Sequence, residues 1–106
     1  MNKIAKSRVN ELINNATAFT DGGEWAIVNG GQNLISINAL EYRDSSTIYI
    51  VEEYKTNDFI MNYDDNININ NINIISLHEF SCASAAAKYY AQRIEAYALQ
   101  RITQSI

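Results

Sequence analysis

Apolar residues near the start of the chain recur at spacings of three to five, as one face of an amphipathic helix requires. They are Ile4, Val9, Leu12, Ile13, Ala16 and Phe19. The spacing predicts a helix from about Lys3 to Ala18. The turn Asp21-Gly22-Gly23 is expected to end it, because glycine adopts left-handed backbone without a side-chain penalty.

A hairpin is predicted next. The run EWAIV, Glu24 to Val28, is rich in strand-forming residues and leads into Asn29-Gly30-Gly31. An Asn-Gly pair between apolar runs indicates a tight hairpin, because both central residues must accept positive φ. The second strand, from Gln32 to about Tyr42, alternates apolar and polar residues, which predicts one buried face.

A third strand is predicted after the turn Asp44-Ser45-Ser46, where TIYIVEEY is dense in β-branched and aromatic residues. The stretch from Lys55 to Asn66 has no clean period and is typical of an acidic connection. Alternation resumes in NININNINI, residues 66–74, and changes phase at Asn70-Asn71. Either a bulge or a two-residue turn explains that change, and arms of only three residues favour a bulged strand.

The alanine-rich run after Phe80 predicts a long C-terminal helix. Ser81 fits as its N-cap, although Ser76-Leu77-His78-Glu79 fits a capping box that would begin the helix five residues earlier. The predicted inner face comprises Ala83, Ala86, Ala87, Tyr90, Ile94, Tyr97, Ala98 and Ile102. The predicted outer face comprises Lys88, Gln92, Glu95 and Gln100.

These elements predict one α+β domain over residues 1–106, in the order α-β-β-β-β-α. The sheet is expected to be antiparallel with three to four strands, and both helices are expected on one of its faces. A chain of this length buries roughly 60–70% of its unfolded surface, so no cofactor is needed to explain its stability.

The single cysteine, Cys82, excludes an internal disulfide and a multi-cysteine zinc site. No apolar run has the length of a signal peptide or of a membrane span. We therefore expect a cytoplasmic protein without membrane contact.

The net charge of −4 is unevenly distributed. Residues 1–20 and 81–106 each carry +2, whereas the segment between them carries −8. Such a segment repels phosphates, so direct binding of nucleic acid is not expected.

Two constellations resemble chemical sites. Asp64-x-Asn66-x-Asn68 begins like a calcium loop, but Ile69 and Ile75 stand where that loop needs glycine and glutamate, so no metal site is predicted.

The second candidate is a catalytic group. An acid, a base and a nucleophile could be supplied by His78, Glu79 and Cys82. Adjacent strand residues point to opposite faces, so no catalytic residue and no cofactor is assigned, and a small enzyme using these three stays an alternative.

The acidic middle segment is the favoured candidate site. Its carboxylates are interleaved with tyrosines, which are enriched at protein interfaces, and a negative patch accelerates association with a basic partner. The predicted partner-binding residues are Glu41, Asp44, Glu52, Glu53, Tyr54, Asp58, Tyr63, Asp64 and Asp65. We expect them on a sheet face away from the helices. Ordinary solvated strands and loops are the competing interpretation.

The short acidic chain, with its hairpin EWAIVNGGQNLISI and its terminal helix FSCASAAAKYYAQRIEAYAL, resembles the small anti-defence proteins that phages and mobile elements encode, anti-CRISPR proteins among them. These proteins share no motif, so the resemblance assigns no residue. It implies a non-enzymatic inhibitor in the host cytoplasm, bound to a host protein or ribonucleoprotein complex with a basic surface. Self-association through a sheet edge such as Asn66 to Ile74 is the alternative from another class.

Overall fold

The computed structural model describes residues 3–19, 23–56 and 72–104. Along the chain these form α1 (Lys3–Asn15), β1 (Ala18–Phe19), β2 (Glu24–Val28), the 3₁₀ turn η1 (Asn29–Gly31), β3 (Asn33–Glu41), β4 (Thr47–Thr56), β5 (Ile72–Phe80) and α2 (Ala83–Gln104). The predicted α+β class and the order of helix, four strands and helix are confirmed. The short strand β1 was not predicted.

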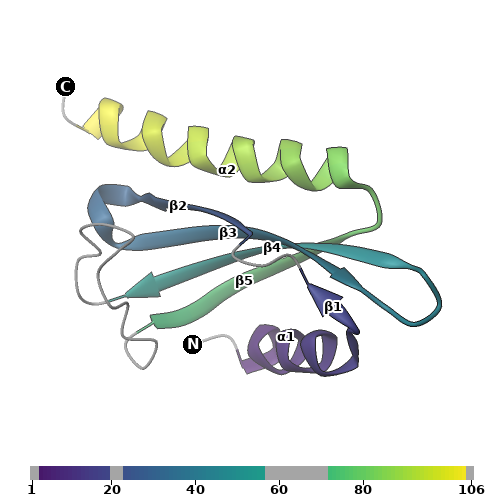
Figure 1. Ribbon diagram of the computed structural model, residues 1–106. Helices are drawn as coiled ribbons and strands as arrows, with labels where there is room; N and C mark the ends of the chain where they lie inside the picture. Colours follow the sequence, from purple (N-terminus) through teal and green to yellow (C-terminus); the bar gives the residue numbers. More distant parts are fainter. Residues whose placement is uncertain (1–2, 20–22, 57–71, 105–106) are drawn as a thin grey trace.

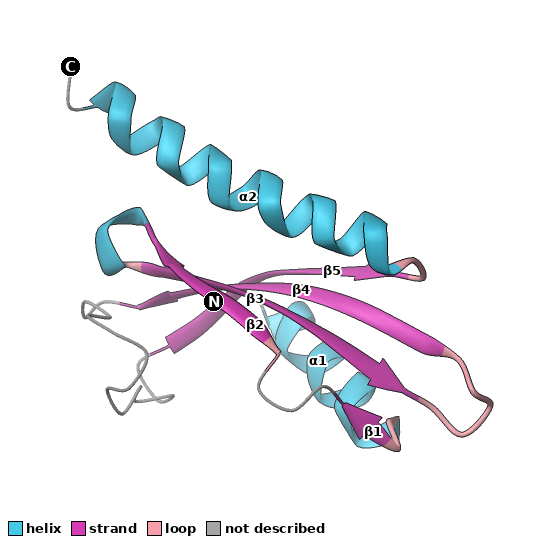
Figure 2. Ribbon diagram, turned by 45° about the horizontal axis from the view of Figure 1, so that its top comes forward, coloured by secondary structure: helices cyan, strands magenta, loops and turns pink. Residues whose placement is uncertain are grey.

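All strand pairs are antiparallel. β4 lies between β3 and β5, and β3 pairs on its other side with β2 and, farther along, with β1. β2, β3 and β4 are successive antiparallel strands, as the predicted hairpin and third strand require. In Figures 1 and 2 the sheet lies between the two helices, with α1 below it and α2 above it.

The two helices therefore cover opposite faces of the sheet, and the prediction that both pack on one face is wrong. The reason lies in β4, where apolar side chains occupy both phases of the strand. Ile50 packs with Leu12 of α1, whereas the next residue, Val51, packs with Ala86 of α2. A strand that is buried on both faces needs a cover on each.

The β2–β3 hairpin is confirmed, with a longer loop than a two-residue turn. Val28 pairs with Asn33, and three successive residues between them have positive φ: 56° at Asn29, 64° at Gly30 and 90° at Gly31. Asparagine and glycine are the residues that tolerate this backbone. The Asn-Gly signal therefore identified the right place.

A register shift in β5 lies at Ile75. Tyr54 pairs with Ile74 and Glu53 pairs with Ser76, so Ile75 is the extra residue of a bulge. Asn70 and Asn71, where a bulge or a turn was predicted, lie outside the described residues.

The last helix begins at Ala83, two residues after Ser81. Ser76 belongs to β5, so the alternative prediction of an earlier helix start is wrong.

The first helix ends at Asn15, three residues earlier than predicted, and β1 takes up Ala18 and Phe19. Among its side chains from Lys6 onward, Val9 and Leu12 are buried, while Ile13 is 44% exposed. Neither described helix is both long and apolar enough to cross a membrane.

The face that α2 presents to the sheet differs from the predicted one. It is made of Ala86, Tyr89, Tyr90, Ile94 and Tyr97. Ala83, Ala87, Ala98 and Ile102, which were predicted to face inward, are exposed. The predicted polar face is exposed, as expected. Alanines on every side of the helix left its inner face ambiguous in the sequence.

Candidate functional site

The structure divides the predicted acidic surface. Glu41 and Asp44 are exposed at the β3–β4 turn, whereas Glu52 and Glu53 are buried and Tyr54 is half-buried. The remaining candidates, Asp58, Tyr63, Asp64 and Asp65, lie outside the described residues. Both faces of the sheet carry a helix, so the expected free face does not exist, and the prediction that Glu52 and Glu53 are surface residues is wrong.

The exposed members of the set that the structure describes, Glu41 and Asp44, lie at one end of the sheet. Glu41 pairs with Thr47 beside the β3–β4 turn, while Asn33, at the other end of β3, pairs with Lys55. Residues 57–71 join β4 to β5 from this second end. A nine-residue strand spans about 30 Å, so the turn and the attachment points of residues 57–71 are not neighbours.

Asp44 has a structural task in its turn. Its Oδ1 accepts hydrogen bonds from the backbone nitrogen of Ser46 at 2.9 Å and from the Ser46 hydroxyl at 2.5 Å. The hydrogen bonds from Ser46 lower the pKa of Asp44 below its ordinary value. An aspartate in this position stabilises the turn, so its exposure alone does not mark a binding site.

Glu53 is the centre of a polar cluster between the sheet and α2. Its Oε1 accepts a hydrogen bond from Arg93 Nε at 3.1 Å, and its Oε2 accepts one from the Tyr97 hydroxyl at 2.5 Å. Arg93 also lies over the ring of Tyr97, with Cζ 5.2 Å from the ring centroid. Burial, followed by the hydrogen bond to Glu53, raises the pKa of Tyr97 to about 12. We call Glu53, Arg93 and Tyr97 the α2 clasp.

Glu52 lies on the other face, towards α1, and has a different environment. Its carboxylate accepts hydrogen bonds from the Tyr54 hydroxyl and the Asn38 amide. Within the described ranges no basic side chain pairs with it. Burial raises the pKa of Glu52, and the two hydrogen bonds only partly oppose that effect.

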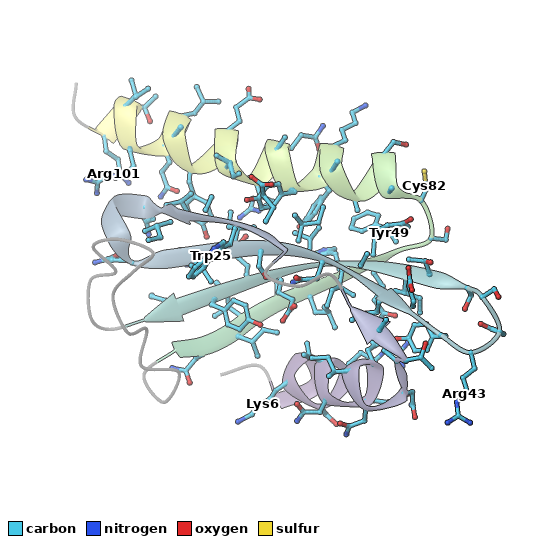
Figure 3. The ribbon with its side chains drawn as sticks, in the orientation of Figure 1. Lys6, Trp25, Arg43, Tyr49, Cys82 and Arg101 are labelled. Atoms are coloured by element: carbon cyan, nitrogen blue, oxygen red, sulfur yellow. The ribbon has the colours of Figure 1, made fainter. Side chains whose placement is uncertain are left out.

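His78, Glu79 and Cys82 are not brought together. Glu79 is bound by Arg8 of α1, with Nε–Oε2 at 2.9 Å and Nη2–Oε1 at 2.8 Å. His78 lies on the other face, 3.3 Å from the Tyr89 hydroxyl. The Cys82 thiol contacts the Ser84 hydroxyl at 3.1 Å, and Figure 3 shows it at the start of α2, directed away from the sheet. The hydrogen bond with Ser84 lowers the pKa of Cys82.

The described part of the chain is electrically balanced. It holds eight of the twelve acidic residues and all eight basic ones. Asp21, Asp58, Asp64 and Asp65 therefore account for the whole net charge of −4. Within the described ranges, no group of three or more histidine, cysteine or acidic side chains could hold a metal ion.

Sequence reasoning missed the partners of Glu53. Arg93 entered only the charge of residues 81–106, and Tyr97 was assigned only to the predicted inner face of the helix. Their spacing of four did place them on one helix face, which was the available signal. Glu53 lies forty positions before Arg93 in the chain, so the sequence alone could not show that the two side chains form a pair.

Comparison with known proteins finds no family model, no curated protein and no solved structure that matches this chain.

Proposed function

We propose that the protein is a non-enzymatic inhibitor that binds a basic surface of a partner. The partner class is a nucleic-acid-processing complex, such as a host CRISPR-type nuclease or surveillance complex, and the proposed source is a phage or mobile element. The proposal follows the resemblance in size, acidity and composition to anti-defence proteins.

The distribution of charge is the observation that carries this proposal. The described helices and strands contribute no net charge, because their acidic and basic residues are equal in number. Three of the four remaining acids, Asp58, Asp64 and Asp65, fall within fifteen consecutive residues that contain no basic side chain. A local excess of carboxylates of this kind attracts a surface that normally holds phosphates.

The proposed mechanism is steric and electrostatic competition. The carboxylates occupy positions that phosphate groups take on the partner, and the bulk of the domain blocks the path of the nucleic acid. Complementary charge mainly increases the rate of association and falls off with ionic strength. The inhibition should therefore weaken as salt rises.

The test is a pull-down with tagged protein from nuclease-treated bacterial lysate, repeated over a salt series and identified by mass spectrometry. We expect a nucleic-acid-processing complex that is lost at high salt. The double substitution Asp64→Lys and Asp65→Lys should reduce its recovery about tenfold or more, because each reversal replaces an attraction with a repulsion.

The matched control carries Glu11→Lys and Glu24→Lys, which change the net charge by the same amount at exposed positions of α1 and β2 that do not belong to the predicted partner-binding set. If both double variants lose the complex equally, only overall charge matters and a local site is wrong. If neither variant loses it, electrostatic mimicry is wrong. Recovery of the tagged protein alone would contradict the proposed class of partner.

A further inference from the structure

The two helices differ in the side that they turn to solvent. The exposed positions of α1 are mostly polar or charged, among them Lys6, Asn10 and Glu11; Figure 3 shows Lys6 directed away from the sheet. Eight of the sixteen exposed positions of α2 are apolar, six of them alanine: Ala83, Ala85, Ala87, Ala91, Ala96, Ala98, Leu99 and Ile102. Leu99 is 54% exposed and Ile102 is 60% exposed.

The outer side of α2 is poor in charge for a surface helix. A helix that covers a core normally carries charged residues on the side away from the core, whereas only Lys88, Glu95 and Arg101 are charged among the sixteen exposed positions of α2. The inner side of α2 is already covered by the sheet. The outer side of α2 therefore has the character of a contact surface.

The outer side is held in a fixed orientation. The α2 clasp binds the middle of the helix to β4. At its C-terminal end, Arg101 lies over the η1 turn, so that a Cβ atom added at Gly30 would meet the Arg101 guanidinium carbon at 3.1 Å. Figure 3 shows Arg101 above that turn. The exposed apolar side chains are thus presented on a helix anchored at two points.

Two charged residues on the outer side indicate which partner fits. Lys88 and Glu95 are exposed, and neither makes an ion pair with another described residue. They are seven residues apart, two turns along the same side, with Ala91 near the midpoint. A second copy of α2, placed antiparallel about a twofold axis near Ala91, brings Lys88 opposite Glu95 at two equivalent contacts. The surface is complementary to itself.

We propose that the outer side of α2 is a homodimer interface, in which two α2 helices pack antiparallel through Ser84, Lys88, Ala91, Glu95 and Ala98. These residues recur at alternating spacings of four and three, which is the period of a helix–helix seam. Ser84, Ala91 and Ala98 are small, which allows close approach of the two helices. A twofold axis makes the contact isologous, so the assembly closes as a dimer. This inference is independent of the proposed inhibitor function.

Sedimentation velocity over a concentration series tests the dimer. Wild-type protein should pass from monomer to dimer as concentration rises. Lys88→Glu alone, or Glu95→Lys alone, faces like charges across both contacts and should raise the dissociation constant about tenfold or more. The double variant Lys88→Glu with Glu95→Lys exchanges the charges and should restore the dimer.

The control is Lys6→Glu, which makes the same charge change on the exposed side of α1 and should leave the dimer intact. All the exchanged positions are exposed, so circular dichroism should show a native fold in every variant. A wild-type protein that stays monomeric overturns the inference. A dimer that survives the single exchanges, or that the double exchange does not restore, also overturns it and directs attention to the outer edge of β5.

Discussion

Glu52 and Glu53 are neighbours in β4, yet they lie on opposite faces of the sheet. Both are buried, with 4% and 5% of their surface exposed. Glu53 meets an arginine and a tyrosine of α2, whereas Glu52 meets a tyrosine of its own strand and an asparagine of β3. Two identical side chains, equally buried and one residue apart, thus have opposite electrostatic environments.

The difference teaches that burial alone does not decide what a carboxylate contributes. A buried charge is costly unless a counter-charge and hydrogen bonds compensate for the lost water. Glu53 has both, because the α2 clasp supplies a guanidinium and a hydroxyl. Glu52 has hydrogen bonds without a guanidinium or ammonium group in the described part of the molecule, and its pKa is raised by burial.

Removal of the clasp carboxylate should have the largest effect. Glu53→Ala leaves the Tyr97 hydroxyl and the Arg93 guanidinium without their acceptor and opens space under α2. We expect the free energy of unfolding to fall by about 3 kcal/mol, at the low end for a broken buried pair because Arg93 can turn to water. Urea denaturation followed by circular dichroism measures it.

The control for that change is Glu24→Ala, which removes an exposed glutamate from β2 at a position that pairs with Ile37. Surface substitutions of this kind usually stay within about 0.5 kcal/mol. Equal losses in the two variants would show that the clasp does not hold α2.

Neutralising Glu52 should change the free energy of unfolding in the opposite direction and by a smaller amount. Glu52→Gln keeps the shape and one acceptor oxygen while removing the charge, which has no basic partner among the described residues. Because burial raises the folded-state pKa of Glu52 above its ordinary value of 4.5, the wild-type side chain stabilises the fold fully only below that value. Its contribution is lost as pH rises through the folded-state pKa.

Melting temperatures of the wild type and the Glu52→Gln variant at several pH values test whether removal of the charge stabilises the fold. The glutamine variant should melt higher than wild type at pH 8, and the difference should shrink towards pH 4, where the wild-type carboxyl group is neutral as well. A variant that melts lower than wild type at pH 8 would contradict the prediction that the buried charge of Glu52 destabilises the fold.

The local signals in the sequence predicted much of the fold. The Asn-Gly pair located the β2–β3 hairpin, and the β-branched run located β4. The placement of the helices could not be obtained in the same way. Ile50 and Val51 are both apolar, so the alternation of apolar and polar residues did not show that β4 is buried on two sides. Both helices were therefore predicted on one face of the sheet.

The candidate site was predicted less well for a related reason. Glu52 and Glu53 were counted as surface acids because charged residues are seldom buried without a partner. The partners of Glu53 lie forty and forty-four positions later in the chain, and only the packing of α2 on β4 brings them near. Periodicity reports local faces, whereas such a pair depends on long-range contacts.

The smallest effect is expected at the other arginine–glutamate pair, Arg8–Glu79, which joins α1 to β5. Its geometry is better than that of Arg93–Glu53, with two hydrogen bonds of 2.8 and 2.9 Å, but its side chains are 38% and 35% exposed, against 36% and 7%. Water and salt screen an exposed pair, so geometry should matter less than burial.

A double-mutant cycle with Arg8→Ala and Glu79→Gln, beside one with Arg93→Ala and Glu53→Gln, compares the two pairs directly. The α1 pair should show weak coupling that vanishes at high salt, whereas the α2 pair should keep its coupling. Because Arg8 lowers the pKa of Glu79, any coupling of the α1 pair should also be lost as pH falls through the folded-state pKa of Glu79. Equal, salt-resistant coupling in both cycles would mean that hydrogen-bond geometry, rather than burial, decides how strongly each helix is held to the sheet.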